Sequence, residues 1–235
     1  MTRFNLRLIP WDPASRSHVQ RLVIQRVQCG WHSEKVVPEW RDQQIRGAKS
    51  IYWITLTDQG DGIRQKLESH FKTYLNEKDP LQDTSRSFPR KHEEPSSDYF
   101  SPIGHISLDI GNDEVSSLEL DIPSHGVCWI KTLYVSHALQ GEGIGRAVMD
   151  IVEELAAKEP LNAKTLALDT VFRDDQLKEE WFLSQGQSPR KVANQDWYAR
   201  RQYQVVAVVP NYYRTPDSNG VVWESRTVFM KKDVA

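Results

Sequence analysis

A glycine-rich stretch in the middle of the chain has the residue types that bind phosphate. Residues 140–146 read Gln-Gly-Glu-Gly-Ile-Gly-Arg, with glycine at every second position from Gly141 to Gly145. Glycine lets the backbone adopt positive φ, and it lets a ligand approach without meeting a Cβ. Successive N–H groups in such a turn form an anion-binding concavity, to which Arg146 can add a charge-assisted contact. The stretch therefore predicts a site for a phosphate-bearing cofactor.

The flanking residues predict a strand before this turn and a helix after it. Residues 127–135 are rich in β-branched and aromatic residues and contain neither Gly nor Pro, which is typical of a strand. After the turn, apolar residues recur at helical spacing until Glu159-Pro160: Val148, Ile151, Val152, Leu155 and Ala156. The unpaired N–H groups and partial positive charge of a helix start then face the turn. The alternative is a glycine-rich connection that binds nothing.

The glycine spacing differs from two common nucleotide-binding patterns and fits a third. A G-x-G-x-x-G fingerprint would need its last glycine where an arginine stands, and the G-K-[ST] of a P-loop is absent. The spacing Q-x-x-G-x-G, carried by Gln140, Gly143 and Gly145, closely resembles motif A of the GCN5-related N-acetyltransferases (GNAT). The resemblance is strong over residues 130–155 and weaker over residues 165–208.

This resemblance implies an α/β (α+β) fold, in which helices flank a central mixed, twisted sheet. It implies one domain over residues 1–235, with insertions at about 58–101 and 172–190. It also implies acetyl-CoA (coenzyme A) as the cofactor, with the Leu133 N–H directed at the thioester oxygen and Val135 paired with the pantetheine arm. The cofactor-binding residues that it implies are Leu133, Tyr134, Val135, Gln140, Gly141, Glu142, Gly143, Ile144, Gly145 and Arg146.

The composition suits one medium-sized domain in a reducing compartment. The chain has 235 residues and a formal net charge of −2, which gives no basic footprint for nucleic acid. Its two cysteines, Cys29 and Cys128, make no disulfide framework. No apolar run approaches the ~18 residues of a membrane helix. We expect a cytoplasmic or nuclear protein, monomer or homodimer, that binds neither nucleic acid nor membrane.

Hydrophobic periodicity predicts the remaining elements. The predicted strands cover residues 4–9, 51–56, 103–110, 165–171, 205–209 and 226–231, and the predicted helices cover 19–27, about 38–48, 63–75 and part of 172–190. Residues 76–97 are rich in Pro, Ser and charged residues and predict a mobile surface loop. The first insertion is thus expected to be a surface helix followed by that loop, serving as a lid, as a partner site or as neither.

One tyrosine is the candidate general acid. Residues 194–206 resemble the family's A-x-x-x-Y-x-x-x-G-F element, which places Tyr198 on the family tyrosine and Gln202 where the family has glycine. By this resemblance Tyr198 protonates the departing thiolate. A phenol with a pKa of about 10 stays protonated at neutral pH and can donate to a thiolate. The alternative is a tyrosine that only packs against the cofactor.

The sequence leaves the general base open. His105 is the best titratable candidate, because it lies on the polar face of a predicted strand. A histidine in a strand is more often structural, and deprotonation through water is a competing route. We expect no metal site. We also expect no covalent mechanism, since Cys29 has no recognisable activating partner.

Aromatic residues can build an acceptor pocket. Trp31 follows the first predicted helix, Tyr212 and Tyr213 follow a predicted strand, and Trp223 lies nearby in sequence. Such rings stack on substrates or cover cations, although Trp31 can equally cap the core. We expect Trp31, Tyr212 and Tyr213 to bind a small-molecule amine. Two alternatives remain open: a protein lysine or N-terminal amine as acceptor, and an inactive acyl-CoA-binding module.

Overall fold

A mixed sheet runs through the computed structural model, which describes residues 5–57, 61–86, 94–184, 192–213, 220–222 and 224–234. In spatial order its strands are β1 (Leu6–Pro10), β2 (Lys49–Leu56), β5 (Gly104–Ile110), β6 (Val127–Val135), β7 (Thr165–Val171), β9 (Arg226–Asp233) and β8 (Gln204–Pro210). β6 and β7 pair in parallel, and β1–β2, β2–β5, β7–β9 and β8–β9 pair antiparallel. This seven-stranded sheet confirms the predicted fold class.

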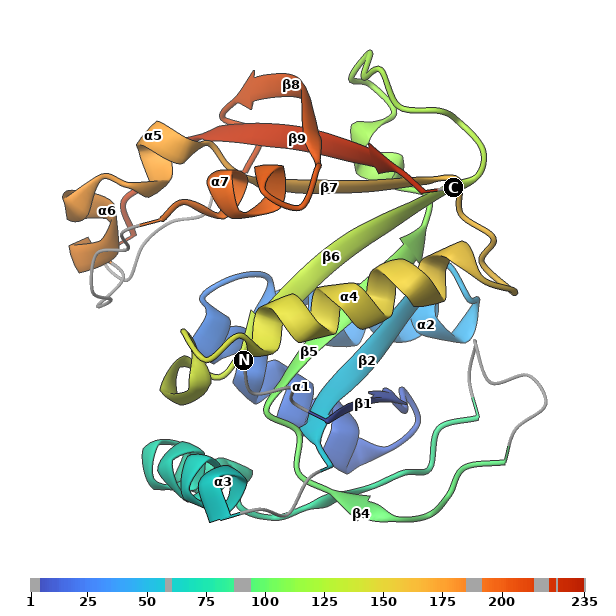
Figure 1. Ribbon diagram of the computed structural model, residues 1–235, viewed down its shortest axis with the longest axis vertical. Coiled ribbons are helices and arrows are strands. Elements are labelled where there is room, and N and C mark those ends of the chain that lie inside the picture. Colours follow the sequence, from blue (N-terminus) through green and yellow to red (C-terminus); the bar gives the residue numbers. More distant parts are fainter. Residues whose placement is uncertain are drawn as a thin grey trace. The chain divides into compact units, whose positions relative to one another are not determined.

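Helices accompany the strands along the chain. They are α1 (Arg16–Cys29), α2 (Arg41–Ile45), α3 (Asp61–Thr73), α4 (Ile144–Ala157), α5 (Arg173–Gln176), α6 (Glu179–Ser184) and α7 (Asn194–Ala199). The short helical turns are η1 (Ser33–Lys35), η2 (Val36–Trp40), η3 (Leu75–Glu77), η4 (Asp113–Val115) and η5 (His137–Leu139). A second sheet pairs β3 (Leu81–Gln82) with β4 (Tyr99–Phe100). In Figure 1, α4 lies in front of β2 and β5, with α2 behind them.

The chain forms two compact units. Unit 1 comprises Met1–Ile110 and Ile130–Asn162, and unit 2 comprises Gly111–Trp129 and Ala163–Ala235. β6 belongs to both, because its first three residues pair with β7 inside unit 2 and the rest of the strand lies in unit 1. The single domain over residues 1–235 stays a prediction.

Backbone signals set the ends of the first helices. α1 ends where Gly30 adopts φ +83° and its N–H bonds to the carbonyls of Arg26 and Val27, as a left-handed C-cap does. The next helix was predicted to reach Ala48, but α2 ends at Ile45. The carbonyl of Ala48 instead accepts the N–H of Ile110 at 2.8 Å, so the chain has already joined the sheet there.

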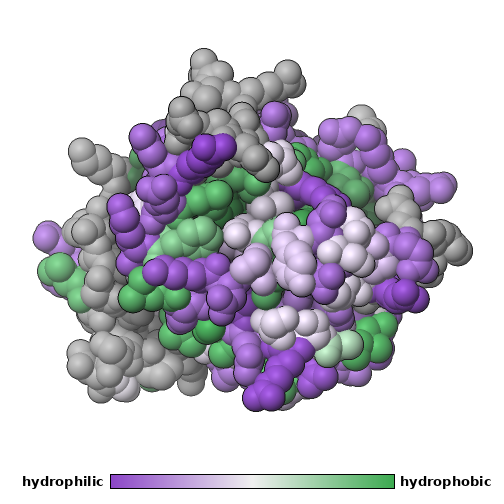
Figure 2. All heavy atoms as spheres, turned by 90° about the horizontal axis from the view of Figure 1, so that it is seen from below, coloured by the Kyte–Doolittle hydropathy of each residue, from purple (hydrophilic) through white to green (hydrophobic). Residues whose placement is uncertain are grey.

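Part of the segment predicted as a mobile surface loop, residues 76–97, is packed: Glu77, Leu81, Asp83 and Ser85 are buried, and most of its other described residues are exposed. Leu81 belongs to a core cluster with Trp11, Trp53 and Phe100. The Asp79 carbonyl accepts a hydrogen bond from Arg21 at 2.7 Å, and the Ser85 hydroxyl donates to the Trp11 carbonyl at 3.0 Å. Figure 2 shows hydrophilic residues interspersed with smaller hydrophobic groups on the face seen from below. The packing uses polar groups, which a hydropathy pattern does not reveal.

β5 and β6 approach so closely that only glycine fits at one position. A Cβ on Gly104 would lie 2.1 Å from the carbonyl oxygen of Tyr134. The Ser136 N–H donates to the Ile103 carbonyl at 2.8 Å, which holds the end of β6 against β5. The strand that leads into the glycine turn is thus fixed by a backbone contact.

We predict that Gly104→Ala lowers the free energy of unfolding by about 3 kcal/mol, because the added Cβ forces the two backbones apart. The matched control is Gly62→Ala on α3, where the new Cβ meets no described atom within 4 Å. Urea unfolding followed by circular dichroism measures both variants. Equal stability of the two variants would contradict the close approach.

Candidate active site

The glycine turn is open in the structure. Gly141 and Gly143 adopt φ +84° and +88°, the left-handed region that glycine enters without strain. A Cβ built on either residue would meet no described atom within 4 Å. Residues 140–143 are exposed, and no side chain in the described part of the chain caps the start of α4. The N–H groups of an uncovered helix start fit an anionic group such as a diphosphate.

The turn is also anchored on both sides. The Gln140 side-chain amide donates to the Val135 carbonyl at 3.0 Å, which ties the turn to the end of β6. Ile144 is buried and fixes the first residue of α4 in the core. Tyr134 is buried as well, so we expect Tyr134 and Ile144 to contact a cofactor through main-chain groups.

β6 contains an irregular residue just before Leu133. Thr132 has φ +58°, which is uncommon for any residue other than glycine and an outlier for a β-branched one. Thr132 and its neighbours Lys131 and Leu133 are all half-buried, so the alternation of buried and exposed side chains expected along a strand is interrupted there. The Thr132 hydroxyl finds no hydrogen-bond partner among the described residues. A left-handed residue turns the peptide that follows it and so re-aims the Leu133 N–H.

His105 is buried in a polar network instead of facing solvent. Its Nδ1 lies 2.9 Å from the Gln25 amide oxygen, so Nδ1 carries the proton and Nε2 faces Arg26 at 3.4 Å. Burial, with Arg26 and Lys49 nearby, holds the pKa of His105 well below its usual value. The strand face predicted to be polar is thus an interior face. A neutral, fully buried imidazole is typical of a structural histidine.

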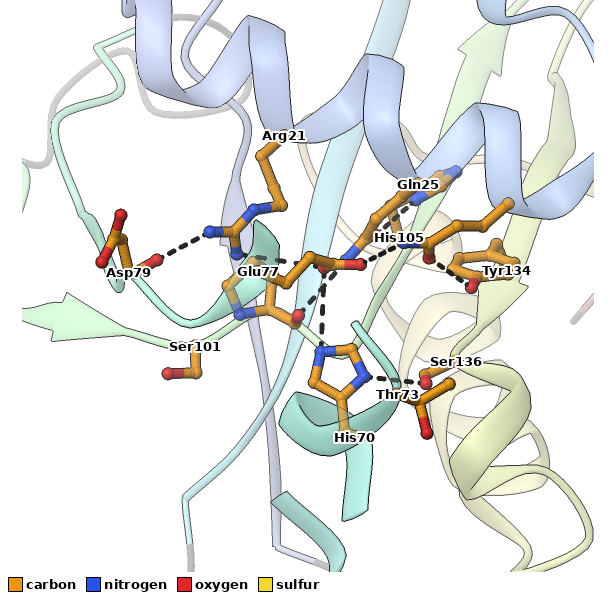
Figure 3. Close-up of polar contacts among 12 residues, drawn as sticks. Arg21, Gln25, His70, Thr73, Glu77, Asp79, Ser101, His105, Tyr134 and Ser136 are labelled. Carbon is orange, nitrogen blue, oxygen red and sulfur yellow. Dashed lines mark hydrogen bonds and ion pairs between the residues drawn. The ribbon is translucent and has the colours of Figure 1, made fainter. Parts of the chain in front are cut away.

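Glu77, which was not among the residues predicted from the sequence, is the centre of the same network. Its carboxylate accepts hydrogen bonds from Gln25 and Gln28, each at 2.7 Å, and lies 3.9 Å from the Arg21 guanidinium. Figure 3 shows Arg21, Gln25 and His70 directed toward it. Burial raises the pKa of Glu77, while both amides and Arg21 oppose that rise. No periodic pattern singles out a lone glutamate at the end of a helical stretch.

The network reaches the central strand and the second half of the insertion helix. The Tyr134 hydroxyl donates to the Gln28 amide oxygen at 2.8 Å, so one glutamine joins Glu77 to β6. His70 of α3 is buried, and its Nδ1 lies 2.8 Å from the Ser136 hydroxyl. Burial and the charge of Arg21 lower the pKa of His70 to about 4. The insertion therefore supports the segment between β6 and the glycine turn.

In unit 2 the structure brings tyrosines to one carboxylate. Tyr213 donates a hydrogen bond to Asp169 at 2.7 Å, and the rings of Tyr212 and Tyr213 lie 4.7 Å apart. Tyr198 on α7 is nearly buried, and burial together with the charge of Asp169 raises its pKa. Asp169 also raises the pKa of Tyr212 and of Tyr213, after burial as the larger cause. No pattern in the sequence singles out Asp169, a charged residue inside an otherwise apolar strand.

The predicted site residues thus fall into two groups. The glycine turn, His105 and the half-buried Trp31 belong to unit 1, where the Trp31 carbonyl accepts a hydrogen bond from Arg26 at 2.7 Å. The tyrosines at 198, 212 and 213 belong to unit 2. Trp223 lies outside the described residues. Gln202 adopts φ +72°, which gives a physical reason for the glycine that the family has there.

Solved structures of several acetyltransferases share this fold. NAA60 from Arabidopsis thaliana in complex with acetyl-CoA has a TM-score of 0.52 and 13% identity, over 98% of this chain and 99% of that one. An aminoglycoside 6'-N-acetyltransferase with coenzyme A has a TM-score of 0.50 and 14% identity, over 97% of each chain. An acetyltransferase from Thermus thermophilus has a TM-score of 0.50 and 11% identity, over 100% of each chain. At these identities the likeness shows the fold.

The sequence match identifies the family. The model of the Acetyltransferase (GNAT) family matches residues 50–186, which is more than half of the chain. The chain therefore belongs to the GNAT acetyltransferase family, and this confirms the class of enzyme that the glycine spacing indicates. Among curated protein sequences, none matches the chain significantly.

We predict that Glu77→Gln lowers the free energy of unfolding by roughly 3 kcal/mol, because it sets an amide N–H₂ against donors from Gln25 and Gln28 and leaves Arg21 without a buried counter-charge. Glu68→Gln is the control, since Glu68 is exposed on α3. Chemical denaturation at pH 7 measures both variants. A Glu77→Gln protein as stable as the control would show that the buried carboxylate is not ionised.

The low pKa of His70 gives a pH prediction. Between pH 6.5 and about 4 the unfolded chain takes up a proton that the folded chain does not, so acid lowers stability over that window. His70→Gln removes this contribution, which is up to about 3 kcal/mol. The variant should lose less stability than the original chain between about pH 7 and about pH 4.5 in urea unfolding. The same pH dependence in both proteins would rule out a neutral His70.

Proposed function

We propose that the protein transfers the acetyl group of acetyl-CoA to a primary amine of a small molecule, by direct attack in a ternary complex. The observation that carries the proposal is the open glycine turn at the start of α4, in a chain of the GNAT family. The turn offers backbone N–H groups and leaves space where side chains would otherwise stand. This is what a diphosphate requires.

The chain would hold the cofactor mainly by its backbone. N–H groups of residues 141–145 bind the diphosphate, with Arg146 exposed beside them. Leu133 and Val135 on β6 contribute main-chain groups to the thioester and the pantetheine arm. The cofactor supplies an acetyl group activated as a thioester. Because the contacts are main-chain ones, substitutions of the side chains at Leu133 and Val135 should have small effects.

Transfer requires one proton to leave the amine and one to reach the sulfur. The neutral amine nitrogen bonds to the acetyl carbon, the carbon–sulfur bond breaks, and the thiolate takes a proton from Tyr198, whose phenolate then regains a proton from water. Burial and the charge of Asp169 raise the pKa of Tyr198, so its hydroxyl is protonated at neutral pH when the thioester is attacked. Burial and a low pKa make His105 a poor acceptor for the amine proton, so we assign that step to water.

The acceptor preference follows from the tyrosine cluster of unit 2. The Asp169 carboxylate and the rings of Tyr212 and Tyr213 combine negative charge with aromatic faces, and both attract an ammonium group. Trp31 is a further candidate contact. A compact cluster of this kind favours a small amine over an extended peptide.

The described residues include no helix able to cross a membrane, and the cytoplasmic location stays a prediction.

An amine panel with acetyl-CoA tests the proposal. We expect coenzyme A release with small primary amines, read as free thiol, and binding of coenzyme A by calorimetry. Acetylation of peptides but not of small amines would favour a protein acceptor instead. Cofactor binding without turnover of any amine would favour an inactive acyl-CoA-binding module.

We predict that Tyr198→Phe lowers kcat at least about tenfold, because the thiolate then leaves without a proton donor. The calorimetric Kd for acetyl-CoA should stay unchanged, which separates loss of the acid from loss of cofactor packing. Tyr203→Phe is the matched control, since the Tyr203 ring packs 5.8 Å from that of Tyr198. Unchanged turnover in Tyr198→Phe would refute the assigned role.

A further inference from the structure

The insertion helix α3 lies against the segment that carries the glycine turn. Lys66 forms a 2.6 Å ion pair with Glu142, which is part of the turn. One helical turn later, His70 contacts Ser136 at 2.8 Å. Residues four apart lie on the same face of a helix. One face of α3 therefore contacts both Ser136, just after β6, and Glu142 in the turn.

Buried contacts fix this arrangement. His70 is fully buried, its ring lies 5.2 Å from that of Phe71 and 5.4 Å from that of Tyr74, and Glu77 follows in the polar network. The second half of α3 is therefore held in place, and Lys66 extends from a fixed backbone. The Lys66 side chain is only 24% exposed, unlike a lysine that moves freely in solvent.

Glu142 places a negative charge in the proposed phosphate site, and Lys66 lies beside it. A carboxylate inside a turn that receives a diphosphate repels the ligand, since like charges a few ångströms apart disfavour each other. Lys66 places a cation at the same point and offsets that charge. An ammonium group held beside a residue of the turn can form a charge-assisted contact with an anionic ligand.

We propose that α3 forms part of the cofactor site and that Lys66 binds a phosphate group of coenzyme A. This inference rests on the proposed function, because it needs the diphosphate to sit on the glycine turn. The insertion then has a defined role: it supplies a phosphate-binding cation on the side of the turn where Glu142 stands.

Calorimetric titration of coenzyme A into Lys66→Gln tests the proposal. We expect Kd to rise about fivefold at low salt, the effect of losing one partly exposed charge-assisted contact, with a shallower dependence of Kd on salt. Lys158→Gln is the matched control, since Lys158 also pairs with a glutamate but lies roughly 20 Å away at the far end of the 14-residue helix α4. Its Kd should match that of the original chain.

Glu142→Gln separates the two roles that Lys66 can have. A direct phosphate contact predicts that Lys66→Gln still weakens binding when Glu142 is already Gln. No further weakening in the double variant would mean that Lys66 only neutralises Glu142, and it would overturn the proposal. Dephospho-coenzyme A assigns the contact: an unchanged effect places Lys66 at the diphosphate, and a lost effect places it at the 3'-phosphate.

The controls also separate this inference from the proposed function. If the original chain binds no coenzyme A, the proposed function fails. If the original chain binds and Lys66→Gln binds equally well, the role of Lys66 alone fails. Equal melting temperatures of the variants exclude a loss of folding as the cause.

Discussion

The structure depends on a turn in which backbone N–H groups are left uncovered. The start of a helix leaves N–H donors without an intrahelical partner, and Gly141 and Gly143 bend the chain there through the left-handed region without placing a Cβ over them. The donors keep their direction because Gln140 is tied to β6 and Ile144 is buried under the helix start. An open site of this kind thus needs rigid neighbours.

The part of the site that could be predicted is the part that is local in sequence. β6, the turn and the start of α4 follow one another along the chain, so propensity, glycine spacing and helical periodicity each indicate them directly. β7 matched the prediction residue for residue because apolar and β-branched residues fill all but one of its positions, the exception being Asp169. Gln202 adopts φ +72°, a conformation that glycine enters without strain, and the register of the Tyr198 segment stays a prediction.

The remaining parts depend on contacts between distant residues. Glu77 is positioned by Gln25 and Gln28, 52 and 49 residues earlier, and an amide–carboxylate contact leaves no periodic trace in the sequence. Asp169 stands in a strand that reads as apolar, and its partner Tyr213 lies 44 residues further on. Which polar side chains become buried depends on tertiary contacts, so a single sequence does not reveal it.

Local propensity also argues against the conformation of one residue in β6. Thr132 is β-branched, yet it adopts the left-handed conformation that such residues avoid. Its neighbours along the strand have ordinary strand propensities, so the residue types do not indicate that Thr132 departs from the strand conformation. Backbone strain of this kind persists only where the surrounding structure holds it, and a single sequence does not show that surrounding structure.

The insertion shows why buried polar contacts matter for function. Residues 76–97 form a polar segment rich in Pro and Ser that predicts a mobile loop, yet Leu81 packs in the core and Glu77 is buried. Buried polar groups stabilise only when their partners are placed accurately, because an unpaired one costs more than a made contact gains. The same accuracy fixes α3, and with α3 it fixes the distance between Lys66 and the turn. The insertion thereby connects the buried polar network of unit 1 to the charges beside its glycine turn.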